Sequence, residues 1–267
     1  MTIRYTSDRN GNETTRPSQT IALVIACATL IVVVAEADEP QKHADQSEFH
    51  FARMAFGAYG SMPSSNRREP WLRDWPAAEI HLTQGISRLT RIDSGSDNRQ
   101  VFLNDDSLFD HPILYAVKVG YWQLSNYESQ RLREFLLRGG FLIVDDFHGP
   151  REWITFSESL RRVFPNRPIV EIPDDDEVFN VLYTLDQRVQ IPGAQAIQYG
   201  VTWEHPQGKA PHWRGIYDDF GRLLVAINFN MDLGDAWEHA DDAFYPEPLT
   251  ALAYRFGINY IIYSMTH

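Results

Sequence analysis

Two runs of apolar residues with a helical pattern between them constrain the fold of this chain more than any other feature. Ile113–Val117 and Phe141–Val144 are almost continuously apolar, which is typical of strands that are buried on both faces of a parallel sheet. Between them, Ser125 is a suitable N-cap for a helix that the pair Gly139-Gly140 ends. A strand, a helix and a second strand in this order predict a right-handed βαβ unit.

The remaining pattern extends this unit into a doubly wound α/β sheet. Apolar residues at helical spacing predict helices at residues 74–90, 151–164 and 249–260, and short apolar runs predict strands at residues 49–54, 101–103 and 168–172. Asp74 is the expected N-cap of the first of these helices, with Pro76 in its first turn. The segments 215–217 and 222–227 flank Asp218–Gly221, which predicts an antiparallel β-hairpin. We therefore expect a mostly parallel sheet with helices on both faces and an added hairpin.

Composition limits the number of domains and the class of partner. The chain has 267 residues, of which 43% are hydrophobic, enough to bury one good core, so we expect a single domain at residues 48–267. Its formal net charge is −12, and the sequence contains no basic stripe that could neutralise a phosphate backbone. Nucleic acid is therefore excluded as a partner, whereas cations and polar molecules are compatible with an acidic surface.

The apolar run Ile21–Ala35 indicates an export signal. It follows three arginines and ends in Ala35-Glu36-Ala37, an A-x-A cleavage pattern. As a helix, its 15 residues span about 22 Å, which is shorter than the roughly 30 Å of bilayer hydrocarbon. We therefore expect residues 1–37 to be a cleaved signal peptide and residues 38–47 to be a polar linker. The alternatives are an uncleaved N-terminal anchor and a lipoprotein that is cleaved before Cys27.

Export would place the protein in the periplasm and would remove its one cysteine. Cys27 lies in the predicted signal peptide, so the mature chain would have no disulfide, no thiolate nucleophile and no cysteine ligand for zinc. The motifs G-x-S-x-G, G-x-x-x-x-G-K-[ST], H-E-x-x-H and G-x-G-x-x-G are also absent from the sequence. The usual signatures of hydrolases, nucleotide-binding proteins and dinucleotide-binding proteins are therefore missing.

Polar side chains follow the second strand of the βαβ unit. Ligands of open α/β sheets bind outside the carboxyl ends of the strands, and Asp145-Asp146-Phe147-His148 lies at such an end. Adjacent strand residues point to opposite faces, so we expect one aspartate at most to face the crevice and its neighbour to cap the following helix. Helix capping alone would explain both carboxylates. Alternatively, Asp145 or Asp146 holds a divalent cation with His148 or acts as a general base.

A second polar segment follows the second strand of the predicted hairpin. In Asn228–Glu238, oxygen ligands are offered by Asn230, Asp232 and Asp235, and an apolar wall is offered by Trp237. Oxygen ligands at alternate positions resemble a calcium loop, but glycine and glutamate do not fall where an EF-hand requires them. The remaining interpretations are a turn in which Asn and Asp bond their own backbone and a polar ligand site.

Four stretches of the sequence carry a resemblance to a known family. They are Gln84–Arg91, Leu137–Phe147, Asn230–Glu238 and Met265–His267. Together they are similar to the bacterial family called domain of unknown function 4159, over roughly residues 48–267. The resemblance implies a flavodoxin-like sandwich of the class I glutamine amidotransferase-like superfamily. It also implies an envelope assembly, because proteins with von Willebrand A-type domains and MoxR-type ATPases often accompany the family.

The resemblance does not extend to glutaminase chemistry. Catalytic members of that superfamily carry a cysteine on a sharp turn after a strand and a histidine that activates it. No residue of this chain matches that cysteine, since Cys27 lies in the predicted signal peptide. Any activity of this protein would therefore need other residues.

These patterns predict an exported, non-catalytic binding or assembly domain of the cell envelope. It would recognise a polar small molecule, a glycan or an envelope protein at the strand ends through the candidate residues Asp145, Asp146, His148, Asn230, Asp232, Asp235 and Trp237. No cofactor is required, although a divalent cation fits these side chains. The alternative is a metal-assisted hydrolase that uses the same acidic residues, so whether the protein is an enzyme stays open. Contact with a membrane is expected only through an uncleaved N-terminal segment.

Overall fold

The computed structural model of the chain describes residues 47, 49–58, 69–96 and 98–267. The predicted signal peptide at residues 1–37 and nearly all of the predicted linker at residues 38–47 lie outside the described residues, and both stay predictions. Within the described part of the chain, no helix is long and apolar enough to cross a membrane.

The centre of the fold is a seven-stranded sheet. Its strands are β1 (Ala52–Ala55), β3 (Arg99–Phe102), β4 (Ile113–Val117), β6 (Phe141–Asp145), β7 (Val170–Glu171), β8 (His212–Tyr217) and β9 (Leu223–Phe229). They lie in the order β3-β1-β4-β6-β9-β8-β7. The first five strands of this order are parallel, and β8 is antiparallel to both β9 and β7. Two further strands, β2 (Gly57–Ala58) and β5 (Trp122–Gln123), form a short antiparallel ribbon.

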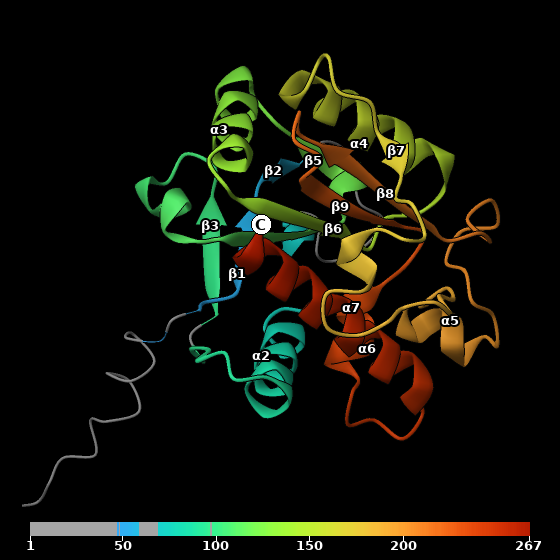
Figure 1. Cartoon of the computed structure of the whole chain (residues 1–267). Helices are drawn as coiled ribbons and strands as arrows, with labels where there is room; N and C mark the ends of the chain where they lie inside the picture. Colours follow the sequence, from blue (N-terminus) through green and yellow to red (C-terminus); the bar gives the residue numbers. More distant parts are fainter. Residues whose placement is uncertain (1–46, 48, 59–68, 97) are drawn as a thin grey trace, which may run out of the picture. The chain divides into compact units, whose positions relative to one another are not determined.

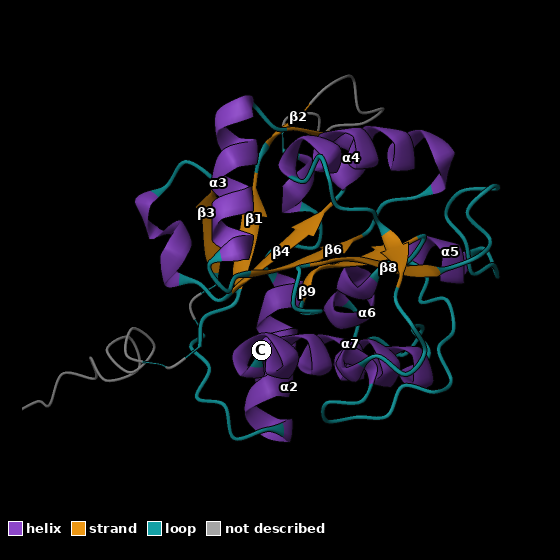
Figure 2. Cartoon of the chain, turned by 45° about the horizontal axis from the view of Figure 1, so that its top comes forward, coloured by secondary structure: helices purple, strands orange, loops and turns teal. Residues whose placement is uncertain are grey.

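Helices cover both faces of the main sheet. The α-helices are α2 (Ala77–Leu89), α3 (Asn126–Leu137), α4 (Gly149–Val163), α5 (Ala194–Gln198), α6 (Leu233–Glu238) and α7 (Glu247–Thr266), and short 3-10 helices lie at Pro70–Leu72, Asp106–Asp110, Val119–Tyr121 and Glu177–Phe179. In Figures 1 and 2, α3 and α4 lie on one face and α2, α6 and α7 on the other. The predicted α/β class, with a mostly parallel sheet and an antiparallel hairpin, is therefore confirmed.

Side-chain alternation along the parallel strands divides the core into two halves. On β4, Tyr115 and Val117 pack with residues of α2, α6 and α7, whereas Leu114 and Ala116 pack with residues of α3 and α4. All of these side chains are fully buried. A strand that is covered on both faces needs apolar residues at every position, which explains the continuous run in the sequence. The same alternation on β6 directs Asp145 toward the α6 face.

The βαβ unit forms as predicted, from β4, α3 and β6. Ser125 is the N-cap of α3, and its side chain forms a capping box with Glu128. β4 and β6 are paired in parallel from Ile113 to Val117. The carboxyl ends of both strands therefore lie side by side, next to the end of β9, which pairs with β6.

One local prediction is wrong. Asp74 is not an N-cap, because α2 starts at Ala77 with Pro76 in the N-cap position. Asp74 instead has a φ of 62°, whereas an N-cap residue usually has extended backbone. In the segment after β9, the side chain of Asp232 bonds nearby backbone and caps the short helix α6.

Candidate functional site

Four non-glycine residues of the described chain have a left-handed backbone, and all four are polar. Lys118 (φ 53°), Asp146 (φ 50°) and Asn230 (φ 63°) directly follow β4, β6 and β9. The fourth is Asp74, before α2. This conformation costs free energy and persists where the surrounding structure holds it, often at functional sites. Here Lys118 N donates to Asp146 O at 3.0 Å, and Asn230 N donates to Phe147 O at 3.1 Å, so the three strand ends are tied together.

Asp145, the last residue of β6, anchors the start of α6. Its Oδ2 accepts hydrogen bonds from the Tyr115 hydroxyl at 2.9 Å, from Leu233 N at 2.7 Å and from Gly234 N at 3.2 Å. The expectation that one of the paired aspartates caps the following helix is wrong, because α4 has no side-chain cap. Asp145 faces α6 and holds that helix against the sheet.

Asp146 lies in a group of charged side chains. Its Oδ1 accepts a hydrogen bond from Lys118 Nζ at 2.5 Å and is 3.2 Å from His148 Nε2. Glu204 comes from the segment between α5 and β8. Its Oε1 is 3.2 Å from His148 Nε2, and its Oε2 is 3.9 Å from Lys118 Nζ. Asp146 is fully buried, and two basic side chains balance the two carboxylates of this group.

Asp74, Asp232 and Asp235 form a second group. Each contributes one carboxylate oxygen, and these oxygens lie within 4.8 Å of one another. Asp232 Oδ1 accepts from Asp235 N at 2.8 Å, and Asp235 Oδ2 accepts from Ala194 N at 2.6 Å. Asp74 and Asp232 are only 7% and 2% exposed. Within the described residues, none of the three forms a salt bridge with a basic side chain.

Gly193 allows the two groups to approach each other. A Cβ on this residue would lie 2.5 Å from Glu204 Oε1, 2.9 Å from Asp235 Oδ2 and 3.0 Å from Asp232 Oδ2. Because Gly193 has no Cβ, the carboxylates of Glu204, Asp232 and Asp235 can converge beside it at the start of α5. We call the combined set, with its two basic side chains, the acidic cluster: Asp74, Lys118, Asp146, His148, Glu204, Asp232 and Asp235.

Burial raises the pKa of several carboxyl groups in and beside the acidic cluster. The pKa of Asp74 and that of Asp232 lie well above the usual range because of desolvation and because other carboxylates, Asp146 and Asp235 among them, are close. Desolvation, with the nearby charge of Asp146, raises the pKa of Asp145 to about 7. The raised pKa values mean that ionising these carboxyl groups costs free energy in the folded protein, a cost that a bound cation would reduce.

The pKa values of His148, Lys118 and Glu204 shift in the direction that keeps each group charged. Burial alone would lower the pKa of His148, but Glu204 and Asp146 outweigh it and raise that pKa to about 9. Burial opposes the charge of Glu204 as well, yet His148 and Lys118 lower its pKa to about 2. His148, Lys118 and Glu204 are therefore all charged at neutral pH.

Two buried carboxylate oxygens of the acidic cluster lack a hydrogen-bond partner among the described residues. They are Asp74 Oδ2 and Asp146 Oδ2. Asp74 Oδ2 lies 2.7 Å from the position that a Cβ on Gly234 would take, and Asp232 Oδ1 lies 3.4 Å from the same point. Buried polar atoms are normally paired, and a buried anionic oxygen without a partner is costly. The two oxygens are the strongest indication of a positively charged ligand.

Asn230 and Trp237, two of the residues singled out from the sequence, have mainly local contacts. Asn230 Oδ1 accepts from Gly149 N at 2.9 Å, and its Nδ2 donates to Ala210 O at 2.8 Å. Trp237 is fully buried, with its ring centroid 5.4 Å from that of Tyr115. Asp146, His148, Asp232 and Asp235 belong to the acidic cluster. Asn230 instead shapes the strand-end turn, and Trp237 packs against Tyr115 in the core.

Three members of the acidic cluster were not among the sequence candidates. Lys118 directly follows an apolar strand, which is the same signal that singled out Asp145, so it could have been found. Asp74 is brought to the cluster by a left-handed turn that its sequence does not reveal. Glu204 lies in an irregular segment and has no sequence signal at all.

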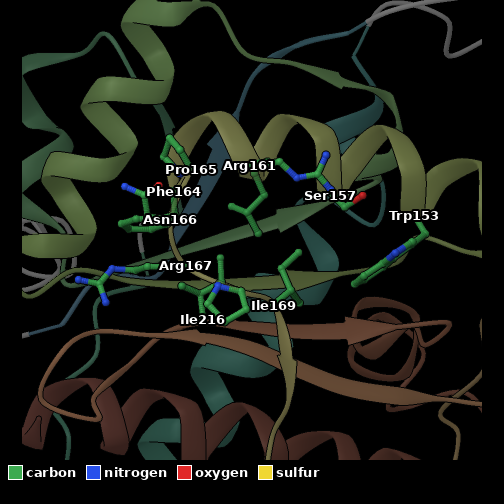
Figure 3. Close-up of a pocket in the computed structure, with 11 residues that line it drawn as sticks. Trp153, Ser157, Arg161, Phe164, Pro165, Asn166, Arg167, Ile169 and Ile216 are labelled. Carbon is green, nitrogen blue, oxygen red and sulfur yellow. The ribbon is translucent and has the colours of Figure 1, made fainter.

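A groove with a cavity volume of about 510 Å³ lies elsewhere, between α4 and β8. In Figure 3, Trp153 lies at one end of this groove and Arg167 at the other, with Arg161 above and Ile216 below. The guanidinium carbon of Arg214 is 4.3 Å from the centre of the Trp153 ring. The residues that line the groove are different from those of the acidic cluster, so the two features are separate.

The free energy of unfolding should fall as the pH rises from 5 to 8 in the absence of metal. The folded pKa of Asp145 (about 7) exceeds its ordinary value of 3.8, so its carboxylate form disfavours folding as it ionises. The folded pKa of His148 (about 9) exceeds 6.5, so its stabilising charge is complete below pH 6.5 and is lost toward pH 9. Glu204 ionises below this range in both states. Between pH 5 and 8 the loss extends over about two pH units for Asp145 and about one and a half for His148, so at about 1.4 kcal/mol per unit it should be roughly 5 kcal/mol.

Urea unfolding with EDTA at pH 5, 6.5 and 8 measures this loss. A free energy that is constant or rises over the range would contradict the assigned charge states.

The fold and the acidic cluster together define an α/β protein with an anionic site at the carboxyl ends of a parallel sheet. The family model described as Domain of unknown function (DUF4159) matches residues 50–265. The chain belongs to this family, as the sequence motifs predict. No curated protein matches the chain. The relation to class I glutamine amidotransferase-like proteins stays a prediction.

Proposed function

We propose that this protein is an exported binding or assembly domain of the cell envelope that holds a divalent cation at the strand ends. Asp74, Asp232 and Asp235 would bind the cation, and the cation would in turn bind a polar small molecule, a glycan or a protein. The observation that carries the proposal is the unpartnered, buried Oδ2 of Asp74 within a group of three converging carboxylates.

Electrostatics supports a cation at this place. Desolvation raises the pKa of Asp74 and that of Asp232, and repulsion from the carboxylates of Asp146 and Asp235 raises both further. The three aspartates form no salt bridge within the described residues. A divalent cation would offset this repulsion and would allow all three groups to stay ionised at neutral pH.

The type of ligand atom limits the metal. The three aspartates offer only oxygen, which hard cations such as Mg²⁺, Ca²⁺ and Mn²⁺ prefer. Three protein oxygens fill only part of the six to eight positions of such an ion. The remaining positions are open to water or to hydroxyl and carboxylate oxygens of a ligand, which fits a polar partner.

Thermal unfolding with and without metal tests the proposal. At a concentration 100-fold above Kd, Mn²⁺ or Ca²⁺ should stabilise the protein by about 2.7 kcal/mol, or roughly 5–10 °C in midpoint for a domain of this size. Asp232→Asn should lose most of this shift. The matched control is Asp175→Asn, since Asp175 is exposed, and it should keep the full shift. Equal shifts in both variants would refute the site.

A second candidate function, metal-assisted hydrolysis, is favoured by one observation. The raised pKa of His148, about 9, keeps a proton donor beside the proposed cation site. In such a reaction the His148 imidazolium would donate its proton to a leaving oxygen, and Asp146 and Glu204 would orient the ring. A panel of nitrophenyl esters and phosphates with Mn²⁺ tests this. Turnover that Asp232→Asn and His148→Gln both abolish would support it, and metal binding without turnover supports the binding role.

A further inference from the structure

The acidic cluster contains two adjacent places with the geometry of a metal site. In the first, the ligating atoms are carboxylate oxygens of Asp74, Asp232 and Asp235. In the second, they come from Asp146, His148 and Glu204, and they also lie within 4.8 Å of one another. The two places adjoin at Gly193, where oxygens of Glu204, Asp232 and Asp235 surround one point at 3.0 Å or less.

The second place already holds a positive charge that the protein supplies. Lys118 Nζ is 2.5 Å from Asp146 Oδ1 and 3.9 Å from Glu204 Oε2. The Lys118 side chain is only 14% exposed, and its left-handed backbone at φ 53° lies where β4 ends. Asp146 and Glu204, two of the three possible metal ligands of this place, thus share one ammonium group.

We infer that the Lys118 ammonium fills the second of two cation positions, so that the native protein holds one divalent cation beside a fixed lysine. The first position is the cation site of the proposed function, and for that position alone the inference rests on the proposed function. The unpartnered Asp146 Oδ2 supports the second position, because a single ammonium leaves one oxygen of this buried carboxylate without a partner. A divalent cation that replaced the ammonium could use that oxygen, Glu204 and the imidazole of His148 after this ring had released its proton.

The inference limits the chemistry of the native site. Enzymes that use two metals hold them about 3.5–4 Å apart and stabilise the attacking and leaving oxygens together. An ammonium group carries half the charge of such an ion and has no open coordination position. A site with one cation and one lysine is therefore suited to holding an oxygen-rich ligand and is not suited to two-metal phosphoryl transfer.

The test is the number of Mn²⁺ ions bound per chain, measured by calorimetry and by electron paramagnetic resonance. Wild type should bind one ion with the spectrum of an isolated Mn²⁺. Lys118→Met should bind two ions with the spectrum of a coupled pair, because Asp146 and Glu204 then lose the ammonium group and His148 can release its proton to bind the second ion. Lys118→Arg keeps the charge and should bind one. Lys209→Met, which removes an exposed lysine that lies over the ring of Trp203, should also bind one.

Each outcome decides between the two proposals. One ion in both wild type and Lys118→Met overturns the inference and leaves the cation site standing. No ion in wild type and one in Lys118→Met overturns the cation site and leaves the inference standing. No ion in either overturns both. A Lys118→Met protein that folds only with Mn²⁺ supports the inference, and one that stays unfolded in saturating Mn²⁺ counts against it.

Discussion

Replacing Arg53 with methionine is expected to lower the free energy of unfolding by about 3–5 kcal/mol, because it leaves a buried carboxylate without its partner. Arg53 lies on β1 and is fully buried, as is the side chain of Glu79. Arg53 Nε donates to Glu79 Oε1 at 2.5 Å. Without the guanidinium, Glu79 would have to be protonated or hydrated inside the core, and either change costs free energy.

The same substitution should also weaken the cation site. Arg53 Nη1 donates to the carbonyl oxygens of Trp71 at 3.0 Å and Arg73 at 2.8 Å. These residues lie immediately before Asp74, so Arg53 holds the turn that places this aspartate in the acidic cluster. A loss of Mn²⁺ affinity in Arg53→Met would accompany the loss of stability even though Arg53 contacts no cation.

Urea unfolding separates the ion pair from a general effect of losing an arginine. The matched control is Arg138→Met, because Arg138 pairs with Glu134 on the surface and is 63% exposed. An exposed pair contributes little, so this variant should lose less than about 1 kcal/mol. The double variant Arg53→Met with Glu79→Leu should recover most of the lost stability, since it removes both charges. A double variant as unstable as Arg53→Met would show that the ion pair is not the cause.

The fold could be predicted from the sequence because the patterns that specify it lie within short stretches and recur along the chain. Ile113–Val117 and Phe141–Val144 are apolar at every position, and only a strand that is covered on both faces needs such a run. Ser125 with Glu128 marks the start of α3 without reference to the rest of the chain. The hairpin of β8 and β9 was visible for the same reason, since its turn residues lie between two apolar runs.

The site could be predicted only in part, because its geometry depends on contacts between distant segments. Asp146 and Asp232 were found since both follow a strand at the carboxyl edge of the sheet. Glu204 reaches them from a segment without regular structure, and Asp74 reaches them through a turn that a buried arginine on β1 holds. Neither arrangement leaves a periodic pattern in the sequence, so only the folded chain brings these carboxylates together.

Replacing Gly193 with alanine should lower the affinity for Mn²⁺ roughly 100-fold, which corresponds to about 2.8 kcal/mol. The backbone of Gly193, with φ −65° and ψ 158°, suits alanine, so the chain itself need not rearrange. The new Cβ would lie 3.0 Å or less from oxygens of Glu204, Asp235 and Asp232. All three carboxylates would have to turn away, and a cation that needs them within a narrow range of distances would lose its ligands together.

The stability of Gly193→Ala distinguishes a lost metal ligand from a damaged fold. In metal-free protein, separating three carboxylates relieves their mutual repulsion, and alanine also restricts the unfolded chain. These gains should offset the loss of the hydrogen bond from Ala194 N to Asp235 Oδ2, so Gly193→Ala should unfold at about the same urea concentration as wild type. Gly57→Ala is the matched control, because its Cβ would meet only Gln123 O at an ordinary 3.6 Å, and its Mn²⁺ affinity should be unchanged. Calorimetry that finds wild-type affinity in Gly193→Ala would show that the converging oxygens do not bind the ion. A loss of affinity without a loss of stability would instead show that this protein keeps its carboxylates together for a ligand and at a cost to its own fold.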